Sequence, residues 1–194
     1  MGRARSGSAA SQVTAQITLR EFEDSDVDAA TAWISDPAVT RFMTWDPGDR
    51  SRAVAWLRRV AADASALPRT SWELAVVELE TSLVVGAGRL TVRDAQHRCG
   101  DIGYVLRRDR WGRGLGSEVA RELVERGFER VGLHRIEATC DVENVASARV
   151  LEKAGLRLEG RLRERFQIRG EWRDLLLYAA LARDDRLQSP DSVL

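Results

Sequence analysis

Three glycines alternate in the stretch Trp111–Ser117, which reads WGRGLGS, and no other stretch is better suited to bind a ligand. A short apolar segment precedes this turn, and a segment with helical spacing of apolar residues follows it. Glycine adopts positive φ readily and lets an anion approach the backbone closely. Because backbone N–H groups and the positive end of the following helix converge on one spot, the turn predicts a site for a cofactor with a pyrophosphate.

Two side chains of the turn could strengthen this anion site. The guanidinium of Arg113 is suited to a charge-assisted hydrogen bond with a phosphate. The hydroxyl of Ser117 could cap the helix that starts here or bind the anion directly.

Two other nucleotide motifs and a turn without ligand compete with this interpretation. The P-loop is excluded, because no Gly-Lys-Ser/Thr sequence follows the glycines. The dinucleotide fingerprint GxGxxG is closer, and Glu137 lies downstream of it. However, the third glycine is Gly116 where that pattern needs position 117, and Glu137 lies inside its predicted strand, away from the edge where a ribose would bind. A glycine turn that binds nothing is the third alternative.

The elements that must position the turn follow from apolar periodicity and from turn residues. Strands are expected at 16–21, 72–79, 83–92, 98–106, 134–140, 156–166 and 172–181, and helices at 25–34, 49–64, 117–130 and 144–154. The short turns between 72 and 106 indicate antiparallel pairing, and the last two strands form a hairpin around Arg169-Gly170. The strand that follows the 117–130 helix should lie parallel to the one that ends at Leu106. This order predicts an α+β fold, with a mixed, mainly antiparallel central sheet flanked by helices.

Composition limits the other possibilities. The chain has 194 residues, with 30 basic and 30 acidic side chains, which fits one domain at 16–183 and gives no net charge to attract nucleic acid. The segments 1–15 and 184–194 are expected to be flexible tails. No apolar run approaches the roughly 18 residues of a membrane span, and no secretory signal is visible, so we expect a cytoplasmic protein that does not bind membranes.

Cysteines and large aromatic residues are assigned to the interior. Cys99 and Cys140 are too few for a disulfide framework and form no metal-binding pattern, so we expect buried thiols and no metal. Four tryptophans are expected in the core: Trp33, Trp56, Trp72 and Trp172.

Three ordered segments resemble the GNAT superfamily of N-acetyltransferases. They read YVLRRDRWGRGLGSEVA, HRIEATCDVENVASARVLEKAGLRLEG and RERFQIRGEWRDLLLYA, and together they extend over about 90–181. The closest likeness is to the RimJ/RimL group within that superfamily. The resemblance implies that two central parallel strands splay apart and that acetyl-CoA is the co-substrate.

The resemblance also places the cofactor. The pantetheine arm would enter the splay and pair with the backbone near Tyr104, Val105 and Leu106. The pyrophosphate would bind to amides of the turn, namely Gly112, Arg113, Gly114, Leu115, Gly116 and Ser117. Asn144, at the start of the next helix, would hydrogen-bond the arm.

Two positions depart from the broad superfamily pattern. Trp111 stands where the pattern has Arg or Gln, and the RimJ/RimL group is similar to this chain in that respect. Leu151 stands where many members have a tyrosine that reprotonates the thiolate of CoA. The N-x-x-S pattern of the RimJ/RimL group matches Asn144 and Ser147, so Ser147 is the candidate acid. Its alternative role is that of an ordinary helix serine bonded to its own backbone.

The remaining roles complete an amine acetylation. Glu137 is proposed as the base, acting through water, although a solvated or arginine-paired strand carboxylate is an equal alternative. The N–H of Val105 or Leu106 would stabilise the oxyanion. Arg41, Phe42 and Trp45 lie in the loop that borders the acceptor cleft in this fold, so they are assigned to acceptor binding, with plain aromatic packing as the alternative.

The expected reaction moves an acetyl group to a primary amine of a small molecule or of a protein N-terminus. A catalytically weak acyl-CoA-binding or sensor module of the same fold is the alternative, since the tyrosine is missing. A homodimer is a possibility that the family suggests.

Overall fold

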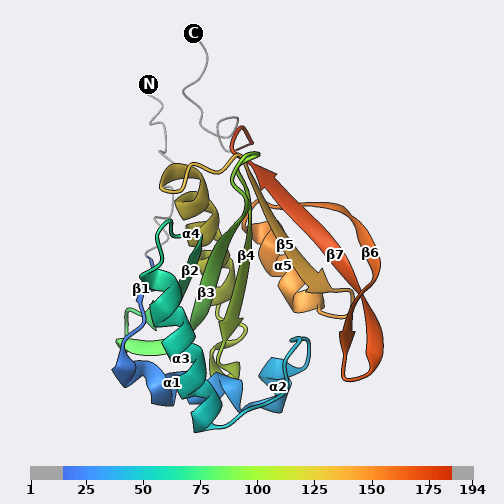
Figure 1. Cartoon of the computed structure of the whole chain (residues 1–194). Helices are drawn as coiled ribbons and strands as arrows, with labels where there is room; N and C mark the ends of the chain where they lie inside the picture. The colour runs from blue at the N-terminus through green and yellow to red at the C-terminus, as the bar shows by residue number, and fades with distance from the viewer. Residues whose placement is uncertain (1–14, 185–194) are drawn as a thin grey trace, which may run out of the picture.

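The structure is a computed structural model that describes residues 15–184. The tails expected at 1–15 and 184–194 fall outside this range, apart from residues 15 and 184, and stay predictions. Seven strands form one sheet in the order β1-β2-β3-β4-β5-β7-β6 (Figure 1). Their bounds are β1 (Ile17–Glu21), β2 (Ser71–Glu78), β3 (Leu83–Asp94), β4 (Cys99–Leu106), β5 (Arg135–Asp141), β6 (Arg157–Ile168) and β7 (Glu171–Leu181).

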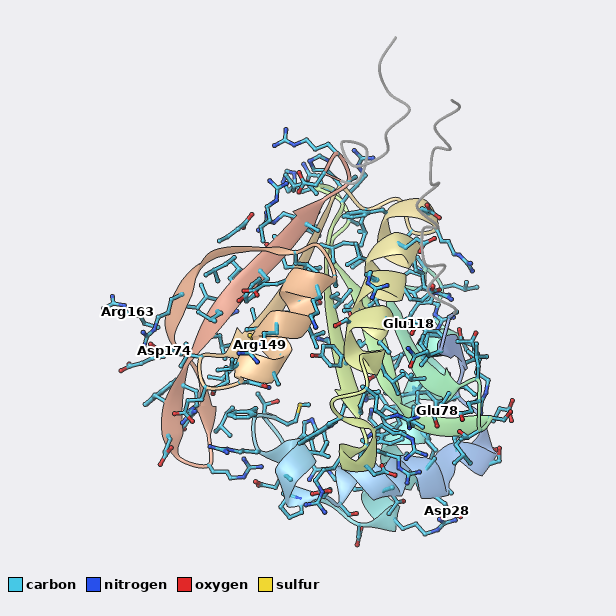
Figure 2. All side chains as sticks on the ribbon, turned by 180° about the vertical axis from the view of Figure 1, so that it is seen from behind. Asp28, Glu78, Glu118, Arg149, Arg163 and Asp174 are labelled. Atoms are coloured by element: carbon cyan, nitrogen blue, oxygen red, sulfur yellow. The ribbon has the colours of Figure 1, made fainter. Side chains whose placement is uncertain are left out.

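Helices cover both faces of the sheet. In chain order the helical elements are η1 (Asp24–Asp26), α1 (Val27–Ile34), α2 (Pro37–Thr40), α3 (Arg50–Ala64), η2 (Arg108–Arg110), α4 (Leu115–Glu129) and α5 (Val145–Lys153). Figure 1 shows α1 and α3 in front of the sheet and α4 behind it. In the reverse view of Figure 2, Glu118 marks α4, and its Oε1 accepts a hydrogen bond from the Gln16 N–H at 2.8 Å.

Alternating side chains divide the strands between two hydrophobic cores. Leu74 and Val76 of β2 pack in the core that contains α4 and α5, whereas Ala75 packs in the core that contains α1 and α3. This is the period-two alternation expected of a strand that is covered on both faces. We call these two sides the α4 face and the α3 face.

The sheet opens between its two central strands. β4 and β5 are parallel, and only three register pairs join them, the last being Asp101 with Glu137. β4 continues to Leu106 and β5 to Asp141, so the two strands diverge for the rest of their length. Every other strand pair is antiparallel. The predicted fold class, the antiparallel meander and the splay are therefore confirmed.

The prediction for the core was wrong at one tryptophan. Trp33 is 1% exposed, but Trp172 is 60% exposed, because it lies in the part of the β6–β7 hairpin that extends beyond the end of β5. Cys140 is buried as expected, while Cys99 is only half-buried.

Candidate active site

One cleft runs from the glycine turn, through the β4–β5 splay, to the loop after α2. Its volume is about 1800 Å³, larger than the roughly 300–1,000 Å³ of a drug-sized pocket, so it has room for a long co-substrate and an acceptor. Fifteen of the sixteen predicted site residues line it, and Arg113 is the exception. Those in the cleft are Arg41, Phe42, Trp45, Tyr104, Val105, Leu106, Trp111, Gly112, Gly114, Leu115, Gly116, Ser117, Glu137, Asn144 and Ser147.

The turn before α4 has the backbone geometry of an anion cradle. Gly112 and Gly114 adopt φ of 76° and 85°, values at which a side chain is strained. Among residues 15–184, no hydrogen-bond acceptor engages the backbone N–H groups of 112–116. The first N–H groups of a helix have no intrahelical partner, and the positive end of the helix dipole lies at the same place. The turn can therefore offer several N–H donors to an anion.

Gly116 lets α4 approach the sheet closely. A Cβ at Gly116 would lie 3.3 Å from both Tyr104 Cε2 and Val150 Cγ2. The third glycine therefore serves close packing of the α4 start against β4 and α5.

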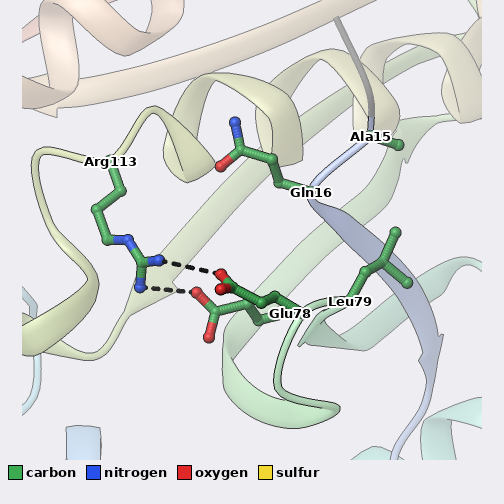
Figure 3. A pocket seen from close by; sticks show the side chains of 6 residues that line it. Ala15, Gln16, Glu78, Leu79 and Arg113 are labelled. Carbon is green, nitrogen blue, oxygen red and sulfur yellow. Dashed lines mark ion pairs between the residues drawn. The ribbon is translucent and has the colours of Figure 1, made fainter.

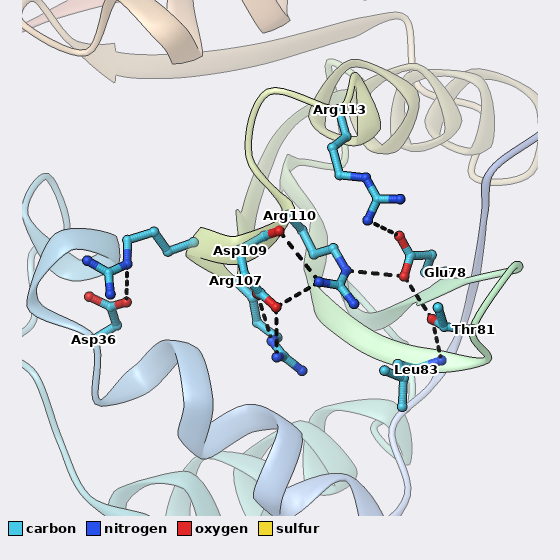
Figure 4. A network of polar contacts seen from close by, with 9 residues as sticks. Asp36, Glu78, Thr81, Leu83, Arg107, Asp109, Arg110 and Arg113 are labelled. Atoms are coloured by element: carbon cyan, nitrogen blue, oxygen red, sulfur yellow. Dashed lines mark hydrogen bonds and ion pairs between the residues drawn. The ribbon is translucent and has the colours of Figure 1, made fainter.

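A buried carboxylate holds the turn from the side away from the cleft. Glu78, at the end of β2, has a side chain that is 3% exposed. Its Oε2 accepts hydrogen bonds from Arg110 Nε at 3.1 Å and from Thr81 Oγ1 at 2.7 Å (Figure 4). Its Oε1 lies 2.8 Å from Arg113 Nη1, an ion pair that is not aligned as a hydrogen bond (Figure 3). The Thr81 hydroxyl, together with Arg110 and against the effect of burial, lowers the pKa of Glu78.

This contact changes the role expected for Arg113. Its guanidinium is directed to Glu78 and, at 3.7 Å, to Glu80, and it does not line the cleft. The Arg113 side chain is thus held by Glu78 and Glu80, and the phosphate contact assigned to it stays a prediction. Only its backbone N–H remains part of the cradle.

Trp111 closes the turn onto β4. Its indole Nε1 donates a hydrogen bond to the Leu106 carbonyl at 3.0 Å, while the ring stays 49% exposed. The indole thus fixes the turn against the end of the strand that lines the splay.

At the splay, the start of α5 brings several polar groups together. Asn144 is the N-cap of α5, and its Oδ1 accepts the Ser147 N–H at 3.1 Å. The Tyr104 hydroxyl donates to Ser147 Oγ at 3.3 Å. Leu151 is 2% exposed and packs in the core. Ser147 therefore supplies a hydroxyl on α5 where Leu151 supplies none, and this hydroxyl is hydrogen-bonded to Tyr104 of β4.

Burial keeps the groups around Ser147 protonated. It raises the pKa of Tyr104, although the Ser147 hydroxyl partly offsets this effect. It also raises the pKa of the Cys140 thiol to about 11, and the charges of Asp141 and Glu152 act in the same direction.

Glu137 has an arginine partner, as the alternative prediction allowed. Its Oε1 accepts from Arg135 Nε at 2.8 Å, and its side chain is 41% exposed. The residue still lines the cleft, at the last register pair before the splay. Oε2 accepts no hydrogen bond within the described part of the chain, so it can take a proton from an amine or a water.

The loop after α2 is held by the tip of the β6–β7 hairpin. Arg169 Nη1 donates to the Arg41 carbonyl at 3.0 Å, and Nη2 donates to the carbonyls of Thr40 at 3.1 Å and Trp45 at 3.4 Å. Its Nε lies 3.1 Å from Asp46 Oδ1. The predicted acceptor residues Arg41, Phe42 and Trp45 line the same cleft as the residues of the splay.

A second contact joins this loop region to the glycine turn. Arg108 Nε of η2 lies 3.1 Å from Oδ2 of Asp36 (Figure 4), and Asp36 Oδ1 caps α2 by accepting the Ala38 N–H at 2.9 Å.

Sequence reasoning missed a row of charged residues on the α3 face. Glu73, Arg89 and Asp101 line the cleft from three adjacent strands. Glu73 faces Arg89 in register, and Arg89 Nη2 donates to Asp101 Oδ2 at 2.7 Å. The alternating charged positions in these strands were the available signal, but only the strand register brings them together.

Residues 15–184 contain neither a metal-binding cluster nor a helix that could span a membrane. No group of three metal-binding side chains occurs there. No helix in this range is long and apolar enough to cross a membrane.

The fold and this cleft define a class of acyl-transferring enzymes, and comparisons with known proteins identify the family. Residues 16–157 match the family model described as an acetyltransferase (GNAT) domain. The chain therefore belongs to the GNAT acetyltransferase family. It is 31% identical over 172 residues to an uncharacterized N-acetyltransferase, p20, from Bacillus licheniformis. The aligned residues cover 88% of this chain and 96% of p20.

Solved structures agree on the fold. The crystal structure of a GNAT-family acetyltransferase from Bacillus anthracis superposes with a TM-score of 0.77 at 27% identity, covering 87% of this chain and 96% of that one. Spermidine N-acetyltransferase from Vibrio cholerae, solved in complex with CoA and spermine, has a TM-score of 0.75 at 20% identity over 87% of this chain and 97% of that one. At that identity the second likeness concerns the fold alone.

Proposed function

We propose that the protein transfers an acetyl group from acetyl-CoA to a primary amine by direct attack in a ternary complex. The observation that carries this proposal is the continuous cleft, which is lined by the N–H cradle of 112–116, by both strands of the β4–β5 splay and by the acceptor loop. A thioester that spans the splay would be within reach of an amine from the α3 face. The relative of known structure that was solved with CoA has the same fold.

The residues that would hold acetyl-CoA are mainly backbone groups. The pyrophosphate would bind the N–H groups from Gly112 to Gly116 and the hydroxyl of Ser117, whose own N–H donates to the Gly114 carbonyl at 3.1 Å. The pantetheine arm would pair with the edge of β4 at Tyr104, Val105 and Leu106, which has no strand partner on the β5 side after Asp101. The side-chain NH₂ of Asn144 remains available to the arm, since only its Oδ1 is used in capping.

The chemistry then uses three groups of this chain. The amine attacks the thioester carbonyl, a C–N bond forms, and the N–H of Leu106 stabilises the oxyanion. The Arg107 N–H donates to the Val85 carbonyl on β3, so the Val105 N–H, two residues earlier, also faces β3 and not the splay. Glu137 takes the proton that the amine loses, directly or through water. As the C–S bond breaks, the Ser147 hydroxyl gives its proton to the sulfur and is reprotonated by the hydroxyl of Tyr104, which recovers a proton from solvent.

Release of free thiol tests the proposal. The protein is mixed with acetyl-CoA and a panel of primary amines, and amine-dependent thiol formation is expected. Glu137→Gln and Ser147→Ala should each lower kcat/KM. If both variants keep full kcat/KM while the wild type is active, the assigned acid and base are wrong although the activity stands.

A second candidate is a catalytically weak acyl-CoA-binding module of the same fold. The buried Leu151 favours it, because this position supplies no hydroxyl to the leaving sulfur. Tight CoA binding by calorimetry, with no thiol release for any amine, would select this candidate.

Three finer points belong to the same proposal. Trp111 and the pair Asn144 and Ser147 favour membership of the RimJ/RimL group. A cytoplasmic location and a homodimer remain predictions, which fractionation and size-exclusion chromatography can test.

A further inference from the structure

The cleft carries more cationic than anionic side chains. Nine arginine and lysine side chains line it, against five carboxylates. Each of the five carboxylates already has an arginine ion pair. A polycationic acceptor would therefore find no carboxylate in the cleft that lacks a partner.

The cations divide between the two ends of the cleft. Arg149 and Lys153 lie one turn apart on α5, the helix that begins beside the proposed arm of CoA, and Figure 2 labels Arg149 there. Both line the cleft. The acceptor end has its own set, on the α3 face and at the loop after α2.

At the acceptor end, the floor of the cleft is a row that begins and ends with arginine. Arg59 Nη2 lies 3.6 Å from Glu73 Oε2, and Glu73 faces Arg89 in the β2–β3 register. Asp101 takes hydrogen bonds from both Arg89 and Arg93. Burial raises the pKa of Glu73, against the attraction of Arg59.

Arg89 lies beside the opening of the splay. It faces Gly103 in the β3–β4 register, and a Cβ on Gly103 would be 3.3 Å from Arg89 Nη2. Gly103 is the second residue after Asp101, where the β4–β5 pairing ends. Among residues 15–184 only Nη2 of Arg89 donates a hydrogen bond, so Nε and Nη1 can still donate, and the side chain is 35% exposed.

Two further arginines, without carboxylate partners among residues 15–184, line the cleft at the acceptor end. Arg52 lies over the Trp45 ring at 5.7 Å, and Arg165 lies over the Phe166 ring at 5.4 Å. Neither arginine has a carboxylate within 4.0 Å in the described chain. Stacking on an aromatic face holds a guanidinium in place and leaves its edge free to donate.

We propose that the acceptor amine carries an anionic group, a carboxylate or a phosphate, that binds to Arg89 at the floor of the cleft. The proposal rests on the acetyl transfer proposed above and names its substrate class. Leu106, whose N–H is the candidate oxyanion donor, is three residues beyond Gly103, which corresponds to roughly 10 Å along a strand, and the hydrogen bonds at both ends take up part of this distance. The amine and the anionic group should therefore be separated by a chain of a few atoms.

A charge series of one chain length tests this inference. The probes are γ-aminobutyrate, the amino alcohol of the same length, and putrescine. They share one amine, and the other end of the chain is anionic, neutral and cationic, respectively. We expect kcat/KM for γ-aminobutyrate to exceed that for the amino alcohol about tenfold, and putrescine to be the poorest. Putrescine as the best acceptor, or equal rates for all three, would overturn the inference while leaving the acetyl transfer intact.

Arg89→Gln tests the residue. It should reduce the ratio of kcat/KM between γ-aminobutyrate and the amino alcohol to near one, whereas Arg58→Gln, on α3 outside the cleft, should leave the tenfold ratio in place. Circular dichroism melting verifies that both variants fold. An unchanged ratio in a folded Arg89→Gln would rule out the role of Arg89.

Calorimetry keeps the inference testable if no amine is acetylated. The three probes are titrated into the protein, with and without CoA. Uptake of γ-aminobutyrate but not of putrescine supports the anion site, and uptake of putrescine or of no probe contradicts it. Failure of the acetyl transfer appears separately, as absent CoA binding or absent thiol release.

Discussion

The two ends of the cleft are built from different parts of the chain. At the glycine turn, one segment of seven residues supplies backbone N–H groups, and Glu78 fixes it from behind through Arg110 and Arg113. At the acceptor end, side chains from α3, β2, β3, β4 and the hairpin meet, and Arg169 holds the loop by its carbonyls. One end is local and preformed, and the other depends on how distant elements pack.

This difference separates cofactor binding, which a short motif can provide in many proteins, from recognition of one particular amine. A diphosphate needs only N–H donors and a helix start, so a short glycine-rich motif suffices. Recognition of one amine needs charges at fixed places on several strands, and each of them can change without altering the turn. Substitutions should therefore affect one end and spare the other, with the largest effect where the two ends meet.

Ser147 lies at that meeting point. Ser147→Ala removes the hydroxyl that would protonate the leaving thiolate, and we expect kcat to fall about a hundredfold, the usual size of a general-acid contribution. The KM values for both substrates should change little. Steady-state thiol release measures both.

The control for this experiment is Ser65→Ala, which removes an exposed serine hydroxyl at the end of α3. A kcat for Ser147→Ala within threefold of the wild type would reduce Ser147 to a residue of the α5 cap.

Glu78→Gln should disturb the glycine turn alone. It leaves two arginines without their shared buried carboxylate, which we expect to cost about 2 kcal/mol of unfolding free energy, since Arg113 is partly solvated. Urea unfolding measures this loss. KM for acetyl-CoA should rise, and KM for the amine should not.

The unfolding free energy measured as a function of pH, in the acid range, gives a second test of Glu78. Its pKa is held below the ordinary value for a glutamate, so its contribution to the unfolding free energy is complete above about pH 4.5 and is lost as the pH falls through the lower folded-state pKa. Glu78→Gln should flatten this part of the profile. Glu80→Gln, at an exposed carboxylate 3.7 Å from Arg113, should leave the profile and both KM values unchanged.

Gly114→Val tests the preformed cradle. A side chain at φ 85° costs about 1–2 kcal/mol, and no atom lies within 4 Å of the new Cβ, so the backbone relaxes instead of the core. CoA affinity should fall about tenfold by calorimetry. Gly132→Val introduces the same strain at φ 75° far from the cleft and should leave the affinity unchanged; an equal loss there would contradict the local cradle.

Arg169→Gln should affect only the acceptor end. Loss of the three carbonyl contacts, at an exposed site, should raise KM for the amine about fivefold without changing the Kd of CoA. Arg163→Gln on the same hairpin is the matched control. A larger effect on CoA than on the amine would show that the two ends are not independent.

The sequence predicted the parts of the site that are local. The spacing of Gly112, Gly114 and Gly116 located the cradle, because its geometry is set within a few residues. Strand order and connection length predicted the parallel pair. The same reasoning could not find Glu73 or Arg89, because their proximity depends on the register of three strands.

Two differences have a similar origin. Alternation assigns Trp172 to one face of a strand, but whether that face is covered depends on the position of β7 and β6 at the sheet edge. The direction of the Arg113 side chain depends on the buried Glu78, which is 35 residues earlier in the chain.

The contact between Arg108 and Asp36 joins the two ends at one carboxylate. Asp36 caps the short helix before the acceptor loop with one oxygen and meets the guanidinium of η2 with the other. By thermodynamic reciprocity, any factor by which CoA changes the affinity for the amine must equal the factor by which the amine changes the affinity for CoA. The order in which the two substrates add would then be set in part by a single shared anion, and Asp36→Asn would make their binding more nearly independent.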